Sequence, residues 1–237
     1  MIDAYYWGTT NGHKMLIALK EMAVEHRLIH VDIGRGDQFD PDFLEIAPNN
    51  KIPAIVDHDP PGGGDPVPLF ESGAILLYLA EKTGKLMPAD WHGRWAVTKW
   101  VAWQVACLGP YGGQALHFRD FAPEPVPYAI DRYTREASRL YAVLDRQLKG
   151  SDFVTGAFSI ADIAVYPWVY PHARMAQDLA DFPNLERWFA AMSERPSVVK
   201  AYDYAAKLER TPLDTEAARK LLLYQDAASI KRWEVDS

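Results

Sequence analysis

The sequence contains a single cysteine, Cys107, among its 237 residues. One cysteine excludes an intrachain disulfide, a CxxC redox pair and a cysteine-based zinc cluster. Cys107 lies in "KWVAWQVACLGPYGG", a stretch dense in apolar residues without a histidine or a second cysteine. This setting is typical of a buried and inert thiol.

Basic runs and long apolar runs are also missing. The chain has 25 Lys and Arg against 32 Asp and Glu, a net charge of −7, which disfavours a nucleic acid partner. No apolar run approaches bilayer length, and the start "MIDAYYWGTTNGHK" lacks a signal peptide pattern. His13, His117 and His172 show no metal-ligand spacing. We therefore expect a cytoplasmic protein with no metal, membrane or nucleic acid ligand.

A hydrophobic content of 49% is ample for a packed core, and its periodicity changes once, near residue 84. Before that point, short β-rich runs alternate with helical segments, and "DPPGGGD" is typical of a turn between antiparallel strands. The pattern predicts strands at 3–7, 27–33, 53–58 and 67–70, and helices at 12–25 and 72–82. The order βαβ, hairpin, helix indicates a compact sheet flanked by helices.

After "TGKLMPAD" the spacing of apolar residues is helical throughout. It predicts helices at 92–118, 128–149, 159–178, 184–194 and 197–209. In "FSIAD", Ser159 and Asp162 fit a helix capping box, with Phe158 available as a hydrophobic staple. We expect a first domain at 1–84 and an all-helical second domain at 92–237, with a helical C-terminal extension from about 210.

The stretch "NNKIPAIVDH" places a proline at the mouth of an apolar strand. Because proline lacks an N–H, Pro53 is tolerated as the first residue of an edge strand. Alternatively, a cis Ile52–Pro53 bond would leave the Ile52 backbone free to pair with an extended peptide. The sequence leaves both interpretations open.

Glu71 and Ser72 stand immediately before the apolar helix "GAILLYLAEK". Helix capping alone would explain both residue types. The same N–H groups and the Ser72 hydroxyl could instead bind a carboxylate, while Glu71 accepts from a neighbouring ammonium. Such a pair would match an amino-acid head group.

At the first strand-to-helix turn, "WGTTNGHK", Thr9, Thr10 or Asn11 can cap the helix. In a thioredoxin-like βαβ unit, this helix N-terminus is where a CxxC pair would stabilise a thiolate. Since cysteine is missing here, any thiolate must arrive with the ligand and be held by hydroxyl, amide and backbone donors. A small peptide with an amino-acid head group and a thiol is glutathione.

The motifs "APNNKIPAIVDH", "LFESGAILLYLAEKTG" and "SIADIAVYPWV" resemble the cytosolic glutathione transferase superfamily. "TTNGHK", "QF" at 38–39 and "PYAIDRY" are similar to its bacterial nu class of disulfide-bond oxidoreductases. The resemblance runs from residue 1 to about 205. It implies an α+β thioredoxin-like N-terminal domain followed by an all-α helical-bundle domain.

The resemblance also implies site residues. Thr9 and Asn11 match the residues near the glutathione sulfur. The implied glutathione-binding residues are Asn11, Gln38, Lys51, Ile52, Pro53, Glu71, Ser72 and Arg132. By itself, Arg132 is more typical of a solvated helix residue paired with Glu136. The chain departs from the family at Thr10, where proline is frequent.

Aromatic residues are weaker candidates for contacts to the thiolate or to a second substrate. Tyr5 or Tyr6 could donate a phenolic hydrogen bond to the thiolate, but alternation along a strand makes one of them core. The nu class uses threonine and asparagine, so both tyrosines rank lower. Four aromatic residues at helical spacing are mostly core, although they could line an acceptor pocket: Trp100, Trp103, Tyr111 and Phe118.

The function that the resemblance implies is glutathione-dependent disulfide reduction without a protein cysteine. One or two glutathione molecules, or oxidised glutathione, would occupy each active site of a homodimer. The alternatives are conjugation of glutathione to an electrophile or reduction of an organic hydroperoxide, which begin with the same thiolate. A noncatalytic glutathione-binding module is an alternative of another class.

Overall fold

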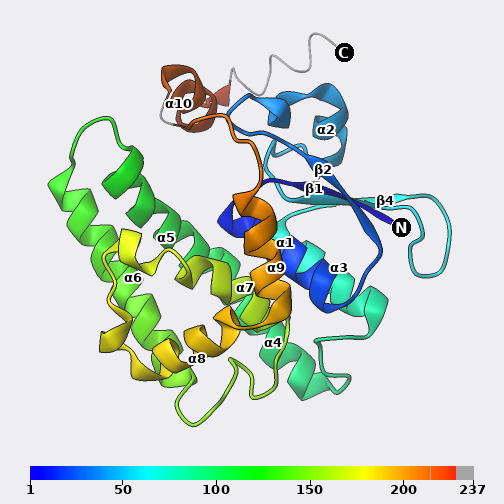
Figure 1. The fold of residues 1–237 in the computed structure, drawn as a ribbon. Helices are drawn as coiled ribbons and strands as arrows, with labels where there is room; N and C mark the ends of the chain where they lie inside the picture. The colour runs from blue at the N-terminus through cyan, green and yellow to red at the C-terminus, as the bar shows by residue number, and fades with distance from the viewer. Residues whose placement is uncertain (214, 228–237) are drawn as a thin grey trace. The chain divides into compact units, whose positions relative to one another are not determined.

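The computed structural model describes residues 1–213 and 215–227 (Figure 1). Its strands are β1 (Ile2–Tyr6), β2 (His26–His30), β3 (Ala54–Asp57) and β4 (Val67–Phe70). Its α-helices are α1 (Thr10–Glu21), α2 (Pro41–Ile46), α3 (Ser72–Thr83), α4 (Trp91–Trp103), α5 (Gly109–Leu116), α6 (Pro127–Gln147), α7 (Ile160–Val169), α8 (Pro183–Ser193), α9 (Pro196–Ala206) and α10 (Glu216–Leu223). Short 3₁₀ segments are η1 (Asp37–Phe39), η4 (His172–Met175) and η5 (Leu179–Asp181), and the π segments are η2 (Gln104–Leu108) and η3 (His117–Phe121).

The four strands form one mixed sheet in the order β2-β1-β3-β4. β1 runs parallel to β2 and antiparallel to β3, which pairs in turn with antiparallel β4. The parallel pair is connected through α1, and the hairpin β3-β4 leads into α3, in agreement with the predicted order. Pro68 lies in β4 at the edge of the sheet, where its missing N–H leaves no interior ladder bond unmade. The predicted α+β fold of the N-terminal part is confirmed.

Alternation along β1 sends consecutive side chains to opposite faces of the sheet. Tyr5 packs against Phe43 of α2, with ring centroids 5.6 Å apart, next to a cluster of Val31, Ala47 and Ala54. Tyr6 faces His13 of α1 instead, with its hydroxyl 3.4 Å from Nδ1. Figure 1 shows the corresponding layers, with α2 on one side of the sheet and α1 and α3 on the other.

The chain clusters into two units, Met1–Tyr78 with the residues from Lys200 onward, and Leu79–Val199. The second unit is helical, as predicted. The domain limits of 1–84 and 92–237 stay predictions. None of the helices in the described ranges combines the length and apolarity needed to cross a membrane.

The capping box predicted at the start of α7 is present. The Asp162 carboxylate accepts from the Ser159 N–H at 3.0 Å, and Ser159 Oγ accepts from the Ala161 N–H at 3.2 Å. Asp162 does more than cap, because its other oxygen accepts from the Val154 N–H and from Trp188 Nε1, both at 2.9 Å. One buried carboxylate thus joins the start of α7 to α8 and to the preceding loop.

Two predicted helices extend furthest beyond the observed ends. The helix predicted over 159–178 ends at Val169, because Pro171 follows and Ala176 adopts a left-handed backbone with φ of 54°. Only a 3₁₀ turn continues the apolar spacing there. The helix predicted over 12–25 ends at Glu21, and Ala23 is also left-handed, with φ of 56°. The helical spacing of apolar residues continues past the C-terminal ends of α7 and α1, so it could not indicate where these helices end.

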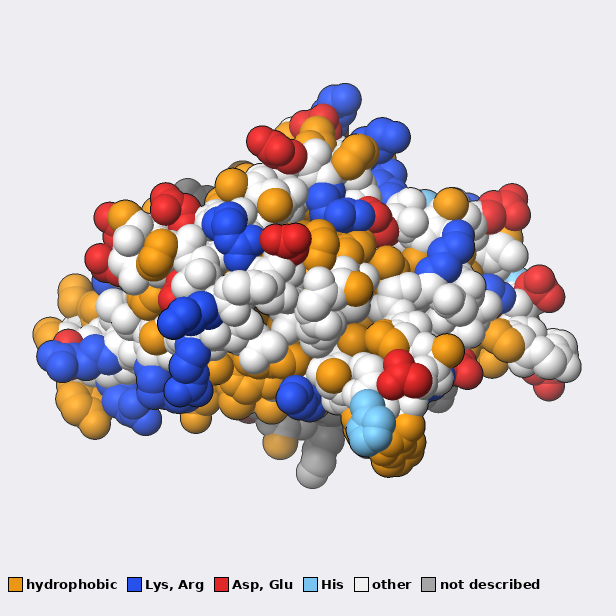
Figure 2. Space-filling view, turned by 90° about the horizontal axis from the view of Figure 1, so that it is seen from below, with side chains coloured by type: hydrophobic (Ala, Val, Ile, Leu, Met, Phe, Trp, Pro, Cys, Tyr) orange, Lys and Arg blue, Asp and Glu red, His pale blue; other side chains and the backbone are white. Residues whose placement is uncertain are grey.

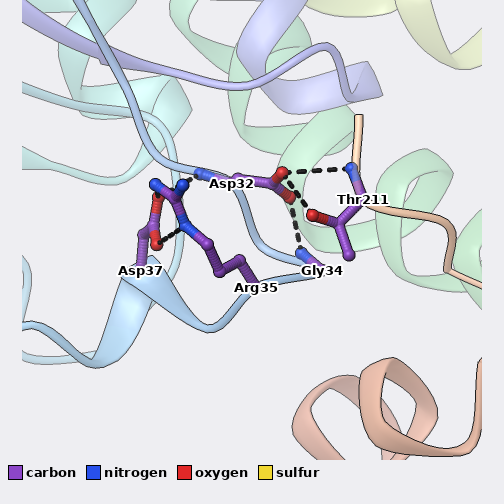
Figure 3. Close-up of polar contacts among 5 residues, drawn as sticks. All are labelled: Asp32, Gly34, Arg35, Asp37 and Thr211. Carbon is purple, nitrogen blue, oxygen red and sulfur yellow. Dashed lines mark hydrogen bonds and ion pairs between the residues drawn. The ribbon is translucent and has the colours of Figure 1, made fainter. Parts of the chain in front are cut away.

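Within the first unit, Asp32 holds the C-terminal segment to the loop after β2 (Figure 3). The Asp32 carboxylate accepts from the Thr211 N–H at 3.1 Å, from Thr211 Oγ1 at 2.8 Å and from the Gly34 N–H at 3.0 Å. The Asp37 carboxylate accepts from the Asp32 N–H and from the Arg35 guanidinium. Asp32 is buried, so these donors replace the water that its carboxylate loses.

Basic, acidic and apolar side chains alternate with uncharged ones on the face seen in Figure 2. Several Lys and Arg side chains gather at the lower left of this view, and others are scattered over the rest of the face. A mixed surface of this kind is typical of proteins whose net charge is moderate.

We expect Asp162→Ala to lower the free energy of unfolding by about 3 kcal/mol, because it leaves three buried N–H donors without an acceptor. Urea unfolding followed by circular dichroism measures this change. Asp131→Ala is the matched control, since it removes an exposed carboxylate that pairs with Arg135 within α6, and it should barely move the midpoint. Equal midpoints for both variants would contradict the role assigned to Asp162.

We expect Thr211→Val to loosen the C-terminal segment, because it deletes one of the hydrogen bonds to Asp32. A loss of about 1 kcal/mol makes local opening about fivefold more frequent. Limited proteolysis should then cleave near residue 211 faster by that factor. Thr98→Val, which removes a hydroxyl that donates to Arg94 O within its own helix, is the control and should leave that rate unchanged.

Candidate active site

One cavity of about 140 Å³ opens where the start of α1, the loop before β3 and the start of α3 converge. Its lining residues are Asn11, Asn49, Lys51, Ile52, Pro53, Phe70, Glu71 and Ser72. Three segments that are not adjacent in the sequence therefore meet at one place. Most of the lining residues are polar or charged, which suits a small polar ligand.

Six of the predicted site residues line this cavity: Asn11, Lys51, Ile52, Pro53, Glu71 and Ser72. Thr9 lies two residues before Asn11, at the N-cap of α1. Gln38 is buried and donates to Ile33 O at 3.3 Å, and it does not line the cavity. Arg132 lies on α6 in the helical unit. The roles of Gln38 and Arg132 in binding stay predictions.

Asn49 and Phe70 line the cavity without having been singled out from the sequence. Both lie within motifs quoted from the sequence, Asn49 at the start of "NNKIPAIVDH" and Phe70 in "LFESGAILLYLAEKTG", so membership of those motifs was the available signal. A third residue behind the cavity wall, Lys14, was also missed. It is the last residue of "TTNGHK".

The N-terminus of α1 is shaped by the "TNG" sequence. Thr9 Oγ1 accepts from the Gly12 N–H at 3.2 Å, as expected of an N-cap residue. Gly12 is required here, since a Cβ at this position would collide with the carbonyl oxygen of Trp7. Because an N–H can only donate, the Thr9 hydroxyl keeps its own hydrogen, which has no acceptor within 1–213 and 215–227. Thr9 can therefore donate to a ligand.

The Ile52–Pro53 peptide bond is cis. Neither the N–H nor the C=O of Ile52 is hydrogen-bonded within the part of the chain that the structure describes. Ile52 is half-buried at the cavity wall, so both backbone groups remain available to an extended peptide.

Glu71 has a left-handed backbone with φ of 71°, although it carries a side chain. This conformation costs about 1 kcal/mol or more for a residue other than glycine, and such residues gather at functional sites. The Glu71 carbonyl accepts from the Ile75 N–H at 2.9 Å, so Glu71 is the N-cap residue directly before α3. The strained residue thus lies at a helix N-terminus and in the cavity wall.

Ser72 does not cap α3, contrary to the simpler interpretation of the sequence. Its hydroxyl oxygen lies 3.2 Å from Nζ of Lys14, a side chain that is only 1% exposed. Burial lowers the pKa of Lys14 to about 7, and the negative charge of Glu71 acts in the opposite direction. Ser72 is therefore connected to α1 through a buried amine.

The C-terminal segment reaches the same region. Gln225 Oε1 accepts from Asn50 Nδ2 at 3.2 Å and from Lys51 Nζ at 3.3 Å. Lys51 lines the cavity, so a residue beyond α10 contacts the cavity wall. Sequence patterns could not reveal this contact, because 174 residues separate the two side chains.

The tyrosine candidates do not line the cavity. Burial raises the pKa of both Tyr5 and Tyr6, so each phenol stays protonated. Tyr6 is fully buried beside His13 and Tyr204, and Tyr5 packs on Phe43. Their lower rank agrees with these positions.

Cys107 lies in the π segment η2 of the helical unit. It is half-buried rather than fully buried, so the expectation of a buried thiol was too strong. Trp100 and Trp103 pack edge to face at 5.0 Å, and Phe118 stacks on Tyr133 at 5.5 Å. These aromatic residues contribute to packing within the helical unit.

The sheet, its helices and the cavity at two helix N-termini define a thioredoxin-like glutathione transferase architecture. The protein-family model of the glutathione S-transferase N-terminal domain matches residues 4–81. The family model of the C-terminal domain matches residues 116–196. The chain belongs to the glutathione transferase family.

Among curated proteins, the chain is 51% identical over 202 residues to the disulfide-bond oxidoreductase YfcG of Escherichia coli, covering 85% of this chain and 94% of YfcG. It is 40% identical over 212 residues to the E. coli disulfide-bond oxidoreductase YghU, covering 83% and 72% of the two chains.

Among solved structures, a glutathione transferase from Burkholderia graminis has two glutathione molecules per subunit. It aligns with a TM-score of 0.82 and 40% identity, over 87% of this chain and 89% of that one. A glutathione transferase from Pseudomonas putida, with one glutathione disulfide per subunit, aligns with a TM-score of 0.81 and 40% identity, over 84% and 90%.

His13, two residues after Asn11, gives a pH-dependent prediction. Its ring is 6% exposed and stacks on Tyr202 at 4.1 Å, and burial lowers its pKa to about 4. In the unfolded chain a histidine takes up a proton near pH 6.5, so stability should fall as pH drops from about 6.5 toward 4. Over this range the free energy of unfolding should fall by about 3 kcal/mol.

His13→Phe keeps the ring stacking and removes the titrating group. Urea unfolding at pH 7 and pH 4.5 should show a smaller acid-induced loss of stability in this variant than in the wild type. If both proteins lose the same amount, the neutral buried state assigned to His13 is wrong.

Proposed function

We propose that this protein is a glutathione-dependent disulfide-bond oxidoreductase that uses glutathione thiols and no protein cysteine. The observation that carries the proposal is the cavity at the N-termini of α1 and α3, where Asn11, Ile52, Glu71 and Ser72 meet without a cysteine. The sole cysteine, Cys107, lies in the helical unit.

The γ-glutamyl head and the cysteinyl backbone of glutathione have partners in this cavity. The carboxylate of the γ-glutamyl head accepts from Ser72 and the N-terminus of α3, and Glu71 accepts from its ammonium. The cysteinyl backbone pairs with the N–H and C=O of Ile52. Lys51 and Pro53 complete the wall. By family resemblance, Gln38 and Arg132 add further contacts.

The thiol of the bound glutathione lies at the N-terminus of α1. The helix dipole and the donors of Thr9 and Asn11 favour the thiolate over the thiol, which lowers the thiol pKa from about 8.5. Thr9 is suited to this role because its hydroxyl hydrogen is left unused by the cap that it forms. A CxxC pair would place its own thiolate at this position.

The reaction is a pair of thiol–disulfide exchanges. The first glutathione thiolate attacks one sulfur of the substrate disulfide, forms a mixed disulfide, and releases one substrate thiolate, which takes up a proton. A second glutathione thiolate then attacks the glutathione sulfur of that mixed disulfide. Oxidised glutathione forms, the second substrate thiol leaves, and two glutathione molecules are oxidised for one disulfide reduced.

The relatives support this choice over a simple conjugation. Two of the similar curated proteins are named disulfide-bond oxidoreductases, and similar solved structures hold two glutathione molecules or one glutathione disulfide per subunit. Those ligands correspond to the second exchange and its product. Homodimerisation, a cytoplasmic location and hydroperoxide reduction remain predictions of the family resemblance.

The test is the reduction of 2-hydroxyethyl disulfide by glutathione, run beside conjugation of an aryl halide. Cys107→Ala should retain disulfide reductase activity. Thr9→Ala should lower kcat/KM about tenfold or more, because it removes a donor to the thiolate, whereas Thr9→Ser should retain most activity. Thr215→Ala is the matched control, since it removes an equivalent N-cap bond, to the Ala218 N–H at 3.2 Å, away from the thiolate.

The other outcomes identify the alternatives. A disulfide reductase activity that is lost in Cys107→Ala contradicts the cysteine-free mechanism. Conjugation without disulfide reduction would indicate an ordinary transferase. Binding to immobilised glutathione with neither activity would indicate a noncatalytic glutathione-binding module.

A further inference from the structure

Lys14 is a charged side chain in an unusual place. It lies on α1, three residues after Asn11, and only 1% of its surface is exposed. Lysine is rarely buried to this extent, because removing an ammonium from water costs several kcal/mol unless partners compensate. Two groups that act on Lys14 belong to the cavity wall: the Ser72 hydroxyl at 3.2 Å and the Glu71 carboxylate.

The bond to Ser72 has a fixed direction. An ammonium can only donate, so Ser72 Oγ must accept, and the single hydrogen of the hydroxyl must point away from Lys14. Within the described ranges, 1–213 and 215–227, this hydrogen has no acceptor. It is therefore left for an oxygen of whatever occupies the cavity that Ser72 lines.

We propose that Lys14 is a positioning residue for the anionic head group bound in this cavity: it holds Ser72 as a hydrogen-bond donor and supplies a positive charge from behind the wall. The inference rests on the proposed function, since the γ-glutamyl carboxylate is the anion in question. It assigns the affinity for that carboxylate partly to a residue that has no direct contact with the ligand.

The protonation state of Lys14 decides whether this arrangement persists. Burial lowers the pKa of Lys14 to about 7, and Glu71 is the ionised neighbour whose charge raises it. His13, the adjacent residue on α1, has a pKa lowered to about 4 and stays neutral above pH 5. Ser72, on the facing helix α3, is uncharged. Lys14 is thus the group in this set that changes charge near neutrality.

The sign of the effect follows from linkage. A bound carboxylate favours the ammonium, so the pKa of Lys14 is higher in the complex than in the free protein. Affinity should therefore fall as pH rises above about 7. A deprotonated amine can also accept from Ser72, which would turn the hydroxyl away from the ligand.

The probe is S-methylglutathione, because its blocked sulfur cannot ionise in this pH range. Calorimetric titrations between pH 6 and 8.5 should show the wild-type Kd rising about tenfold, as expected for about one unit of pKa difference between complex and free protein. Lys14→Met should bind about tenfold more weakly at pH 6, with a nearly flat profile. Lys14→Arg, which keeps its charge, should bind at pH 8.5 as tightly as at pH 6.

Lys20→Met, on the same helix, is the control and should retain the wild-type profile. If the wild type does not bind S-methylglutathione at any pH, the proposed function itself is overturned. If the wild type binds with a flat profile, or if Lys14→Met keeps the wild-type pH dependence, only the role of Lys14 is overturned. If Lys14→Met does not fold, Lys14→Arg is the deciding variant. An affinity of Lys14→Arg that falls with rising pH as in the wild type would overturn the inference.

Discussion

The hydrogen bond between the buried Lys14 amine and Ser72 joins the start of α1 to the start of α3. The cavity consists of these two helix starts and the loop before β3. Two adjacent helix N-termini would bring unsatisfied N–H groups and like dipole ends together, which favours an anionic occupant between them. Glu71, strained into a left-handed backbone beside them, adds a carboxylate that can accept from an ammonium. The site is thus matched to a zwitterionic head group next to a thiol.

At both ends of the ligand site, a hydroxyl oxygen accepts a hydrogen bond from the protein itself. Thr9 Oγ1 accepts from the Gly12 N–H, and Ser72 Oγ is held by Lys14. In each case a structural donor occupies the oxygen and leaves the hydroxyl hydrogen for the ligand. A hydroxyl whose direction is fixed before binding loses less rotational freedom when the ligand arrives. At the start of α1, where a cysteine is missing, the Thr9 hydroxyl is therefore already oriented to donate to a sulfur that the ligand brings.

Local sequence patterns predicted most of the fold, and together with the family resemblance they pointed to six residues that line the cavity. The βαβ order, the hairpin and the "SIAD" cap are each signalled by periodicity, turn residues or cap residues that lie close together in the sequence. The end of α7 at Val169 was missed because apolar spacing continued beyond it. Lys14 and Gln225 were missed for another reason: each matters through a partner 58 or 174 residues away, and neither forms a short motif with it.

The C-terminal segment lies outside the two regions that the family models match. Residues beyond 196 lie outside both matched family regions, yet Thr211 binds Asp32 and Gln225 binds Lys51. The Lys51 ammonium has three donors, so its bond to Gln225 leaves capacity for a ligand carboxylate. Gln225 also restricts where that ammonium can point. Chemistry at the sulfur therefore depends on residues inside the family regions, whereas the geometry at Lys51 depends on a segment outside them.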